Sequence, residues 1–213
     1  MRSALLLLLA CSACNPQVPA PGEAPSPASV QERLLDDTRL LLSSTDSAGS
    51  LTAERHVQEG WMAGLVDLAI ANGELVVTAD DETLTITTLA VGFQPLDIPV
   101  EVFGGHMAQI KDLRVELAHP VIAPATWTSE DEVHVNANLD VKLTWALAID
   151  GSPAPLGSPK LPPVPVEIVV TGDGEHVHAE VHASAPGELW SWASLVRISD
   201  LALILDASSV ETR

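Results

Sequence analysis

The chain of 213 residues is poor in aromatic and in basic residues. It has no tyrosine, two phenylalanines and five tryptophans, so aliphatic side chains must fill its core. Only 10 Lys and Arg stand against 29 Asp and Glu, a formal net charge of −19. Without a cluster of bases to neutralise phosphates, a nucleic acid is not expected as a partner, and an anionic lipid surface would not attract the chain electrostatically.

The sequence also lacks the short motifs of common catalytic sites. It has no Gly-x-Ser-x-Gly elbow, no His-Glu-x-x-His, no P-loop, no Gly-x-Gly-x-x-Gly and no Cys-x-x-Cys. Its two cysteines, Cys11 and Cys14, lie near the N-terminus, which leaves the rest of the chain without disulfide or thiol chemistry. We therefore expect a protein that is not an enzyme and that uses no cofactor.

What is present is a sizeable apolar fraction, 46% of the residues, in a chain long enough for one domain with a tail. This fraction is sufficient for a packed core, which argues against general disorder. The excess of acids is typical of a protein kept soluble by self-repulsion.

The N-terminus begins with a basic residue, Arg2, followed by an apolar run over residues 4–10 that is too short to span a membrane. The run leads into LLAC at residues 8–11 and CSAC at residues 11–14. These stretches resemble the lipobox of bacterial lipoproteins, in which Leu, a small residue and Ala or Gly precede the lipidated cysteine. LLAC departs from the pattern at Leu9, where a small residue is expected. CSAC departs from it at Cys11, where Leu is expected.

The resemblance implies a signal peptide and lipidation region at residues 1–14, with Cys11 slightly favoured over Cys14. It implies a lipid-anchored protein of the cell envelope, in the outer membrane and facing the periplasm. The alternative is an ordinary secreted protein cleaved after small residues. Residues 15–29 contain five prolines and no hydrophobic period, which is typical of an extended tether.

Residues 30–213 are predicted to form a single α+β domain with two helices at its start. Ser29 and Glu32 have the spacing of a capping box, and a second helix is expected from about Thr52, ending near a turn at Asn72-Gly73. Helical spacing supports both elements. The apolar residues of the first are Val30, Leu34, Leu35, Leu41 and Leu42, and those of the second are Val57, Trp61, Leu65 and Leu68.

The rest of the chain is predicted to form a long, twisted, mostly antiparallel sheet on which the helices pack. Residues 133–150 alternate apolar and polar over 18 positions, which predicts one unusually long strand with a single apolar face. A hairpin is expected over residues 164–185 with a Gly172-Asp173-Gly174 turn, and a strand over residues 200–207. Residues 151–165 hold six prolines and are expected to lie outside the sheet, while residues 188–197 are expected to form a short helix or a loop.

Helices followed by long antiparallel strands on a lipid-anchored chain resemble the tubular lipid-binding proteins and related bacterial lipoproteins, over residues 30–207. In that family a sheet wraps a helix and leaves an apolar groove for acyl chains. The resemblance implies a lipid or another hydrophobic molecule as ligand. The residues expected to contact it are Val135, Leu139, Val141, Leu143, Trp145, Leu147, Val166, Ile168, Val177 and Val181.

The alternative is that the helices seal this apolar face into a dry core. The protein would then be a structural or interaction lipoprotein that contacts another protein of the envelope.

One group of histidines has the spacing of metal ligands. His176, His178, Glu180 and His182 alternate onto the polar face of one predicted strand, where two histidines and a carboxylate could bind one ion. Such a site also needs a converging partner, for which Glu167 on the neighbouring strand is a candidate. Without evidence of that partner, we interpret the group as a solvated sheet face and expect no metal site.

Overall fold

The computed structural model describes residues 28–154, 161–192 and 196–209. The described part of the chain is mostly β, with 73% of its residues in strands and 2% in helix. The predicted α+β class, with two N-terminal helices packed on a sheet, is therefore wrong. The signal peptide, both cysteines and nearly all of the tether lie outside the described residues.

One short helix and thirteen strands make up the described part of the chain. Their bounds are α1 Val30–Arg33, β1 Thr38–Leu42, β2 Ala48–Val57, β3 Gly60–Ala79, β4 Thr83–Phe93, β5 Leu96–Ile98, β6 Ala108–Leu117, β7 Val121–Ser129, β8 Glu132–Leu139, β9 Val141–Ile149, β10 Ser152–Ala154, β11 Val164–Gly172, β12 Val177–Trp192 and β13 Val196–Ser209.

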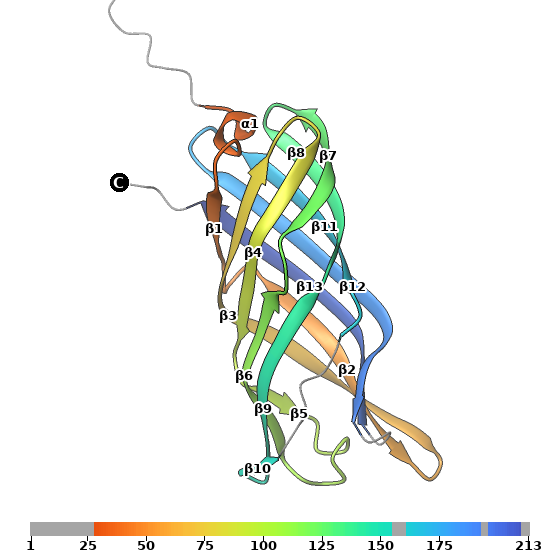
Figure 1. Cartoon of the computed structure of the whole chain (residues 1–213). Coiled ribbons are helices and arrows are strands. Elements are labelled where there is room, and N and C mark those ends of the chain that lie inside the picture. Colours follow the sequence, from red (N-terminus) through yellow and green to blue (C-terminus); the bar gives the residue numbers. More distant parts are fainter. Residues whose placement is uncertain (1–27, 155–160, 193–195, 210–213) are drawn as a thin grey trace, which may run out of the picture.

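All strand pairs are antiparallel, and the sheet closes on itself (Figure 1). Following the pairings from β3 through β2, β13, β12, β11, β8, β7 and β4 leads back to β3. β3 makes the closure possible because it is long enough to pair with β2 along its first half and with β4 along its second half. β1 lies between β3 and β13 beyond the end of β2.

The helix α1 covers one end of this closed sheet, at the top of Figure 1. Its Val30 and Leu34 are 1% and 0% exposed. Gln31 donates its backbone N–H to the carbonyl of Glu130 in the β7–β8 turn, and Leu34 accepts at 2.6 Å from the N–H of Ala79 at the end of β3. We call this the closed end, defined by α1 and by the turns after β3, β7 and β11.

The opposite part of the sheet is built differently. There β4 pairs with β6, β6 pairs with β5 and β9, and β9 pairs with β10. The other edge of β9 faces away from β6. Among the described residues, β9 is paired on this edge only at residues 147–149, with β10. β12 beyond Ala183 pairs only with β13 in this part of the chain. We call this region, between residues 141–146 of β9 and residues 184–192 of β12, the open side.

The first predicted helix is reduced to a single turn. The capping box is confirmed, because the Ser29 side chain accepts from the N–H of Glu32 and the Glu32 side chain accepts from the N–H of Ser29. Beyond it the chain becomes β1, in which Leu40 and Leu42 are buried while Leu41 is 43% exposed. Burial alternates from one residue to the next, as in a strand, although the spacing of the apolar residues also fits a helix.

The second predicted helix is absent, because its residues form the β2–β3 hairpin. Trp61 and Leu65, expected on the buried stripe, are 39% and 66% exposed, whereas Leu68 is buried on the opposite face. The predicted turn at Asn72-Gly73 is also wrong: β3 continues through it with a register shift. A Cβ on Gly73 would lie 2.3 Å from Cδ1 of Leu42, so this glycine allows close packing rather than a turn.

The long strand predicted over residues 133–150 is two strands that separate at Asp140. β8 pairs with β7 and β11, whereas β9 pairs with β6 and β10. The alternation continues across the break, and the apolar residues of both strands face inward. The sequence therefore predicts the face of each residue correctly and the number of strands wrongly, because alternation specifies a face and not a partner.

The predicted hairpin over residues 164–185 is confirmed as β11 and β12, with Val166 opposite Ala183 and Ile168 opposite Val181. The other two expectations for this part of the chain need correction. Residues 152–154 of the proline-rich stretch pair with β9 and Pro165 lies in β11, while residues 155–160 lie outside the described residues. Residues 188–192 continue β12 and residues 196–197 begin β13, in place of a helix or loop.

Among the described residues, no helix combines the length and the apolar character that a membrane crossing needs.

Candidate ligand-binding cavity

An apolar cavity lies inside the sheet, toward the open side. Inward-facing residues of β2, β3, β4 and β6 form one part of its wall, and those of β11, β12 and β13 form another. The first group includes Leu51, Leu68, Leu89, Val91, Phe93 and Leu113. The second includes Val164, Val166, Val181, Ala183, Leu203 and Leu205.

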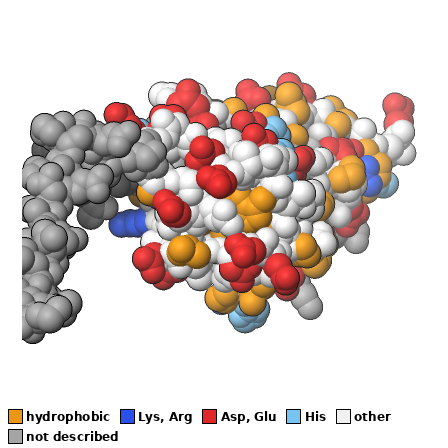
Figure 2. All heavy atoms as spheres, turned by 90° about the horizontal axis from the view of Figure 1, so that it is seen from above, with side chains coloured by type: hydrophobic (Ala, Val, Ile, Leu, Met, Phe, Trp, Pro, Cys, Tyr) orange, Lys and Arg blue, Asp and Glu red, His pale blue; other side chains and the backbone are white. Residues whose placement is uncertain are grey.

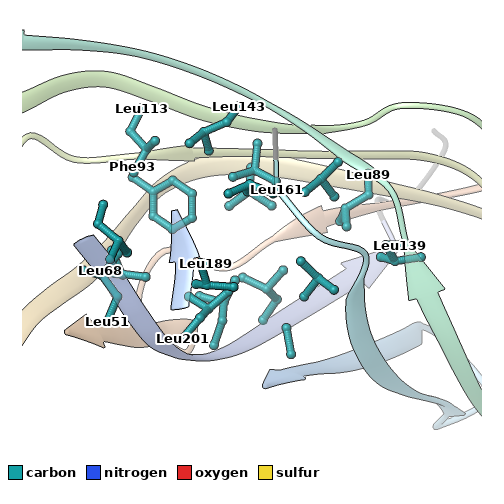
Figure 3. Close-up of a pocket in the computed structure, with 18 of the residues that line it drawn as sticks. Leu51, Leu68, Leu89, Phe93, Leu113, Leu139, Leu143, Leu161, Leu189 and Leu201 are labelled. Atoms are coloured by element: carbon teal, nitrogen blue, oxygen red, sulfur yellow. The ribbon is translucent and has the colours of Figure 1, made fainter. Parts of the chain in front are cut away.

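These side chains reach the cavity because each strand alternates its residues between the two faces of the sheet. Figure 3 shows Leu113 and Leu143 projecting into the space from one side, and Leu189 and Leu201 from the other. Leu161 also points into it, from the stretch that precedes β11. Leucines far apart in the sequence thus converge on one space.

The wall of the cavity is entirely apolar. None of its lining residues is ionisable, and no polar atom contributes to its surface. The cavity has a volume of about 120 Å³. Water needs two to four polar partners to occupy a protein interior stably, so this wall favours a hydrocarbon over water.

The cavity is only partly enclosed, and its less buried residues indicate where it opens. Leu51, Leu68 and Leu89 are nearly fully buried, whereas Val141, Leu143 and Trp145 on β9 are half-buried although they face inward. Leu201 and Leu203 on β13 are half-buried as well. The exposed part of the wall on β9 therefore lies along the open side, where the edge of β9 away from β6 has no strand neighbour among the described residues.

Six of the ten residues predicted to contact a ligand line the cavity, and four do not. Those in its wall are Leu139, Val141, Leu143, Trp145, Val166 and Val181. Val135, Leu147, Ile168 and Val177 are buried in the core elsewhere. The predicted face is thus divided between a cavity and a dry core.

Sequence reasoning missed the other half of the wall. Leu68 falls in the second predicted helix, Leu51 lies just before its start, and Leu189 falls in the predicted helix or loop, so the sequence does not predict their inward orientation. The alternation of Leu51 with Ala53, and of Val66 with Leu68 and Ile70, was the signal that could have identified them. Leu161 carries no such signal, because it lies outside the regular strands.

The outer face carries the histidines and carboxylates. His182 pairs with Glu180 and, at 2.6 Å, His134 pairs with Glu132, whose pKa is lowered mainly by the hydrogen bond from His134. Glu167 lies opposite His182 in the β11–β12 register, as the sequence suggested.

The turn between β11 and β12 holds the most strongly perturbed carboxyl group. The backbone N–H groups of His176 and Glu175 donate to Asp173 and lower its pKa from 3.8 to about 2. Asp173 is therefore ionised at any physiological pH.

Figure 2 shows the molecule from above. On the face seen there, acidic side chains are scattered, with apolar and uncharged groups between them. Such a distribution is typical of solvated charge rather than of a site that binds one charged ligand.

No family model matches the chain, and no curated protein matches it in sequence. We therefore infer the function from the cavity itself.

Proposed function

We propose that this protein is a lipid-anchored protein of the cell envelope that binds one hydrophobic molecule with an aliphatic chain in the cavity of its sheet. The observation that carries the proposal is a partly open cavity whose surface exposes no polar atom. Ligand sites of proteins are concave and mostly apolar, as this cavity is.

The chemistry of the wall limits the ligand. Each methylene transferred from water into such a cavity contributes about 0.8 kcal/mol, so a chain of several methylenes binds well. A polar headgroup inside would have no hydrogen-bond partner and would cost several kcal/mol. The headgroup therefore stays at the open side, beside the half-buried Leu143 and Trp145, and the cavity takes a fatty-acid or phospholipid chain by its tail.

The anchor belongs to the proposal because it keeps the domain beside the source of its ligand. A lipidated Cys11 or Cys14 followed by a tether would hold the sheet close to a bilayer facing the periplasm. The net charge of −19 leaves little electrostatic attraction to anionic headgroups, so covalent lipid is the expected means of attachment.

The proposal is tested with the full chain carrying Cys11→Ser and Cys14→Ser, which removes the protein's own acyl chains. The double variant should leave the membrane fraction, and native mass spectrometry should show it with one co-purified lipid. Added fatty acid that is brominated along its chain should quench the fluorescence of Trp145. The contribution of Trp145 is the difference in quenching between the double variant and the same protein with Trp145→Phe.

A matched pair of variants then locates the ligand. Leu143→Asp places a charge in the wall, so bound lipid should be lost while circular dichroism stays unchanged. Thr144→Asp introduces the same charge at the next residue of β9, whose side chain is exposed, and should keep the lipid. If the double variant carries no lipid and its Trp145 is not quenched, lipid binding is wrong, and a closed protein that contacts an envelope partner becomes the better reading.

A further inference from the structure

Three side chains capable of binding a metal meet at the closed end, away from the cavity. Asp173 and His176 lie in the turn between β11 and β12, and His178 is the second residue of β12. One ligand atom of each lies within 4.8 Å of the others. In the described part of the chain, this is the one group of three His, Cys, Asp or Glu residues that comes so close.

The distances between these atoms are close to those in an occupied site. Nε2 of His178 lies 3.6 Å from Oδ2 of Asp173, and Nδ1 of His176 lies 3.8 Å from Oδ1 of the same carboxylate. In a tetrahedral zinc site with bonds of about 2.0–2.2 Å, ligand atoms are about 3.4 Å apart. Side-chain rotations would therefore bring one oxygen of Asp173 and the two ring nitrogens to one ion.

The surroundings hold two of the three groups in place. Nδ1 of His178 lies 3.0 Å from Oγ of Ser208 on β13, and donation to that oxygen leaves the lone pair of Nε2 directed at the carboxylate. The carboxylate of Asp173 is held through Oδ1 by the N–H groups of Glu175 and His176, at 2.9 and 2.7 Å.

The turn is tied to the rest of the closed end. The guanidinium of Arg33 in α1 donates to the carbonyls of Gly174 and Glu175. The N–H of Val177 donates to Oγ of Ser209 at 3.0 Å. The turn is thus connected to α1 and to the end of β13.

We propose that Asp173, His176 and His178 bind a zinc-type divalent cation at the closed end, with water in the fourth position. Two imidazoles and one carboxylate are the ligand set of many three-ligand zinc sites. His176 and His178 are 33% and 41% exposed, which leaves room for the water. The ion would link the turn between β11 and β12 to the start of β12, beside the contacts of the turn with α1 and β13. It would stabilise the closed end whether or not the cavity holds a ligand.

This assignment differs from the one that the sequence suggested. Glu180 and His182 pair with each other further along β12, and the third ligand is Asp173 from the turn rather than Glu167. Elsewhere His134 pairs with Glu132, and His106 pairs with Asp150 at 2.6 Å. These two-residue pairs provide matched controls.

The test is a zinc titration of the full chain with Cys11→Ser and Cys14→Ser and without a histidine tag, because thiols and tags bind zinc themselves. Calorimetry at neutral pH should show one zinc per chain, and a saturating amount should raise the thermal midpoint. Cobalt should give the visible absorption of a four-coordinate site. Calcium and magnesium, which prefer oxygen ligands, should not compete.

Variants decide whether the named residues hold the ion. His176→Gln, His178→Gln and Asp173→Asn should each weaken zinc binding at least tenfold, and Ser208→Ala should weaken it by about 10-fold because it frees the His178 ring. His182→Gln and His134→Gln should stay within twofold of the parent.

The absence of one-to-one binding would overturn the site, as would an equal loss in His182→Gln and His178→Gln. All these side chains are partly exposed, so circular dichroism of the metal-free variants should match the parent.

Discussion

β8 and β9 follow one another in the sequence with the same alternation, yet they end in different surroundings. The inward residues Val133, Val135 and Leu139 of β8 are at most 1% exposed. On β9 the inward residues Leu143 and Trp145 are only half-buried. Most of the first strand belongs to a dry core under α1, and only Leu139 at its end lines the cavity. The second strand forms part of the cavity wall.

The difference comes from the neighbours of each strand rather than from its own residues. β8 is paired with β11 along its whole length and with β7 over residues 132–135. β9 is paired with β6 on one edge and only at residues 147–149 on the other. An apolar face therefore becomes core where the sheet continues past it, and becomes a binding surface where the sheet stops.

The largest expected effect comes from placing a charge in the dry core and, for comparison, in the cavity wall. Ile168 on β11 is 1% exposed in the dry region, so Ile168→Asp should bury a charge without a partner, at a cost of several kcal/mol. That is a large part of a typical domain stability of about 5–15 kcal/mol, and the variant should unfold or fail to express. Leu143→Asp should remain folded, because its position is open to solvent.

Urea unfolding and soluble yield measure both variants, and an alanine pair keeps the comparison measurable if Ile168→Asp cannot be purified. Ile168→Ala should cost about 2–5 kcal/mol. Leu143→Ala should cost clearly less, because the side chain gives up less buried area. Equal losses at the two positions would show that the two regions do not differ in packing.

A smaller effect is expected from opening the closed end. Leu34 after α1 is 0% exposed, and its truncation to alanine should cost about 2–5 kcal/mol in the free energy of unfolding. Leu35 is the adjacent control: it is 63% exposed, and Leu35→Ala should change the stability by less than about 0.5 kcal/mol. If both variants unfold at the urea concentration of the parent, α1 does not contribute to the core.

The smallest effect concerns acid. Hydrogen bonds from the backbone N–H groups of Glu82 and Thr83 lower the pKa of Asp80, in the turn after β3 at the closed end, below its ordinary 3.8. A carboxyl group whose pKa is lower in the folded state adds stability above its unfolded pKa and loses it as the pH falls toward the folded value. The thermal midpoint of the parent should therefore decrease below about pH 4.

Asp80→Asn removes this titration while it keeps an oxygen that can accept the same hydrogen bonds. Its thermal midpoint should fall less steeply with acid than that of the parent, measured by circular dichroism between about pH 5 and 2. Asp81→Asn changes the neighbouring carboxylate, which accepts from the Gln31 side chain, and serves as the control. Parallel curves for the parent and Asp80→Asn would refute the assignment.

The candidate sites were predictable only in part, and for different reasons. Leu139, Leu143 and Val166 could be identified as wall residues because alternation fixes their face. Leu68 could not be identified, because the spacing of residues 52–68 predicts a helix there, and apolar residues three or four apart fit a helix while their neighbours also fit a strand. The metal cluster needed Asp173 to fold back beside His178, which depends on the hydrogen bonds of a turn.

By itself the sequence determined which side of β8, β9, β11 and β12 is apolar, the hairpin over residues 164–185, the capping box at Ser29 and the excess of acidic residues. These features depend on residues within a few positions of one another, where the geometry of the chain leaves few choices. The tertiary structure decided that β3 pairs with both β2 and β4, that the sheet closes, and that β9 is left with a partly free edge. Those outcomes depend on pairings between distant segments, and an alternating pattern fits many partners equally well until the whole sheet selects among them.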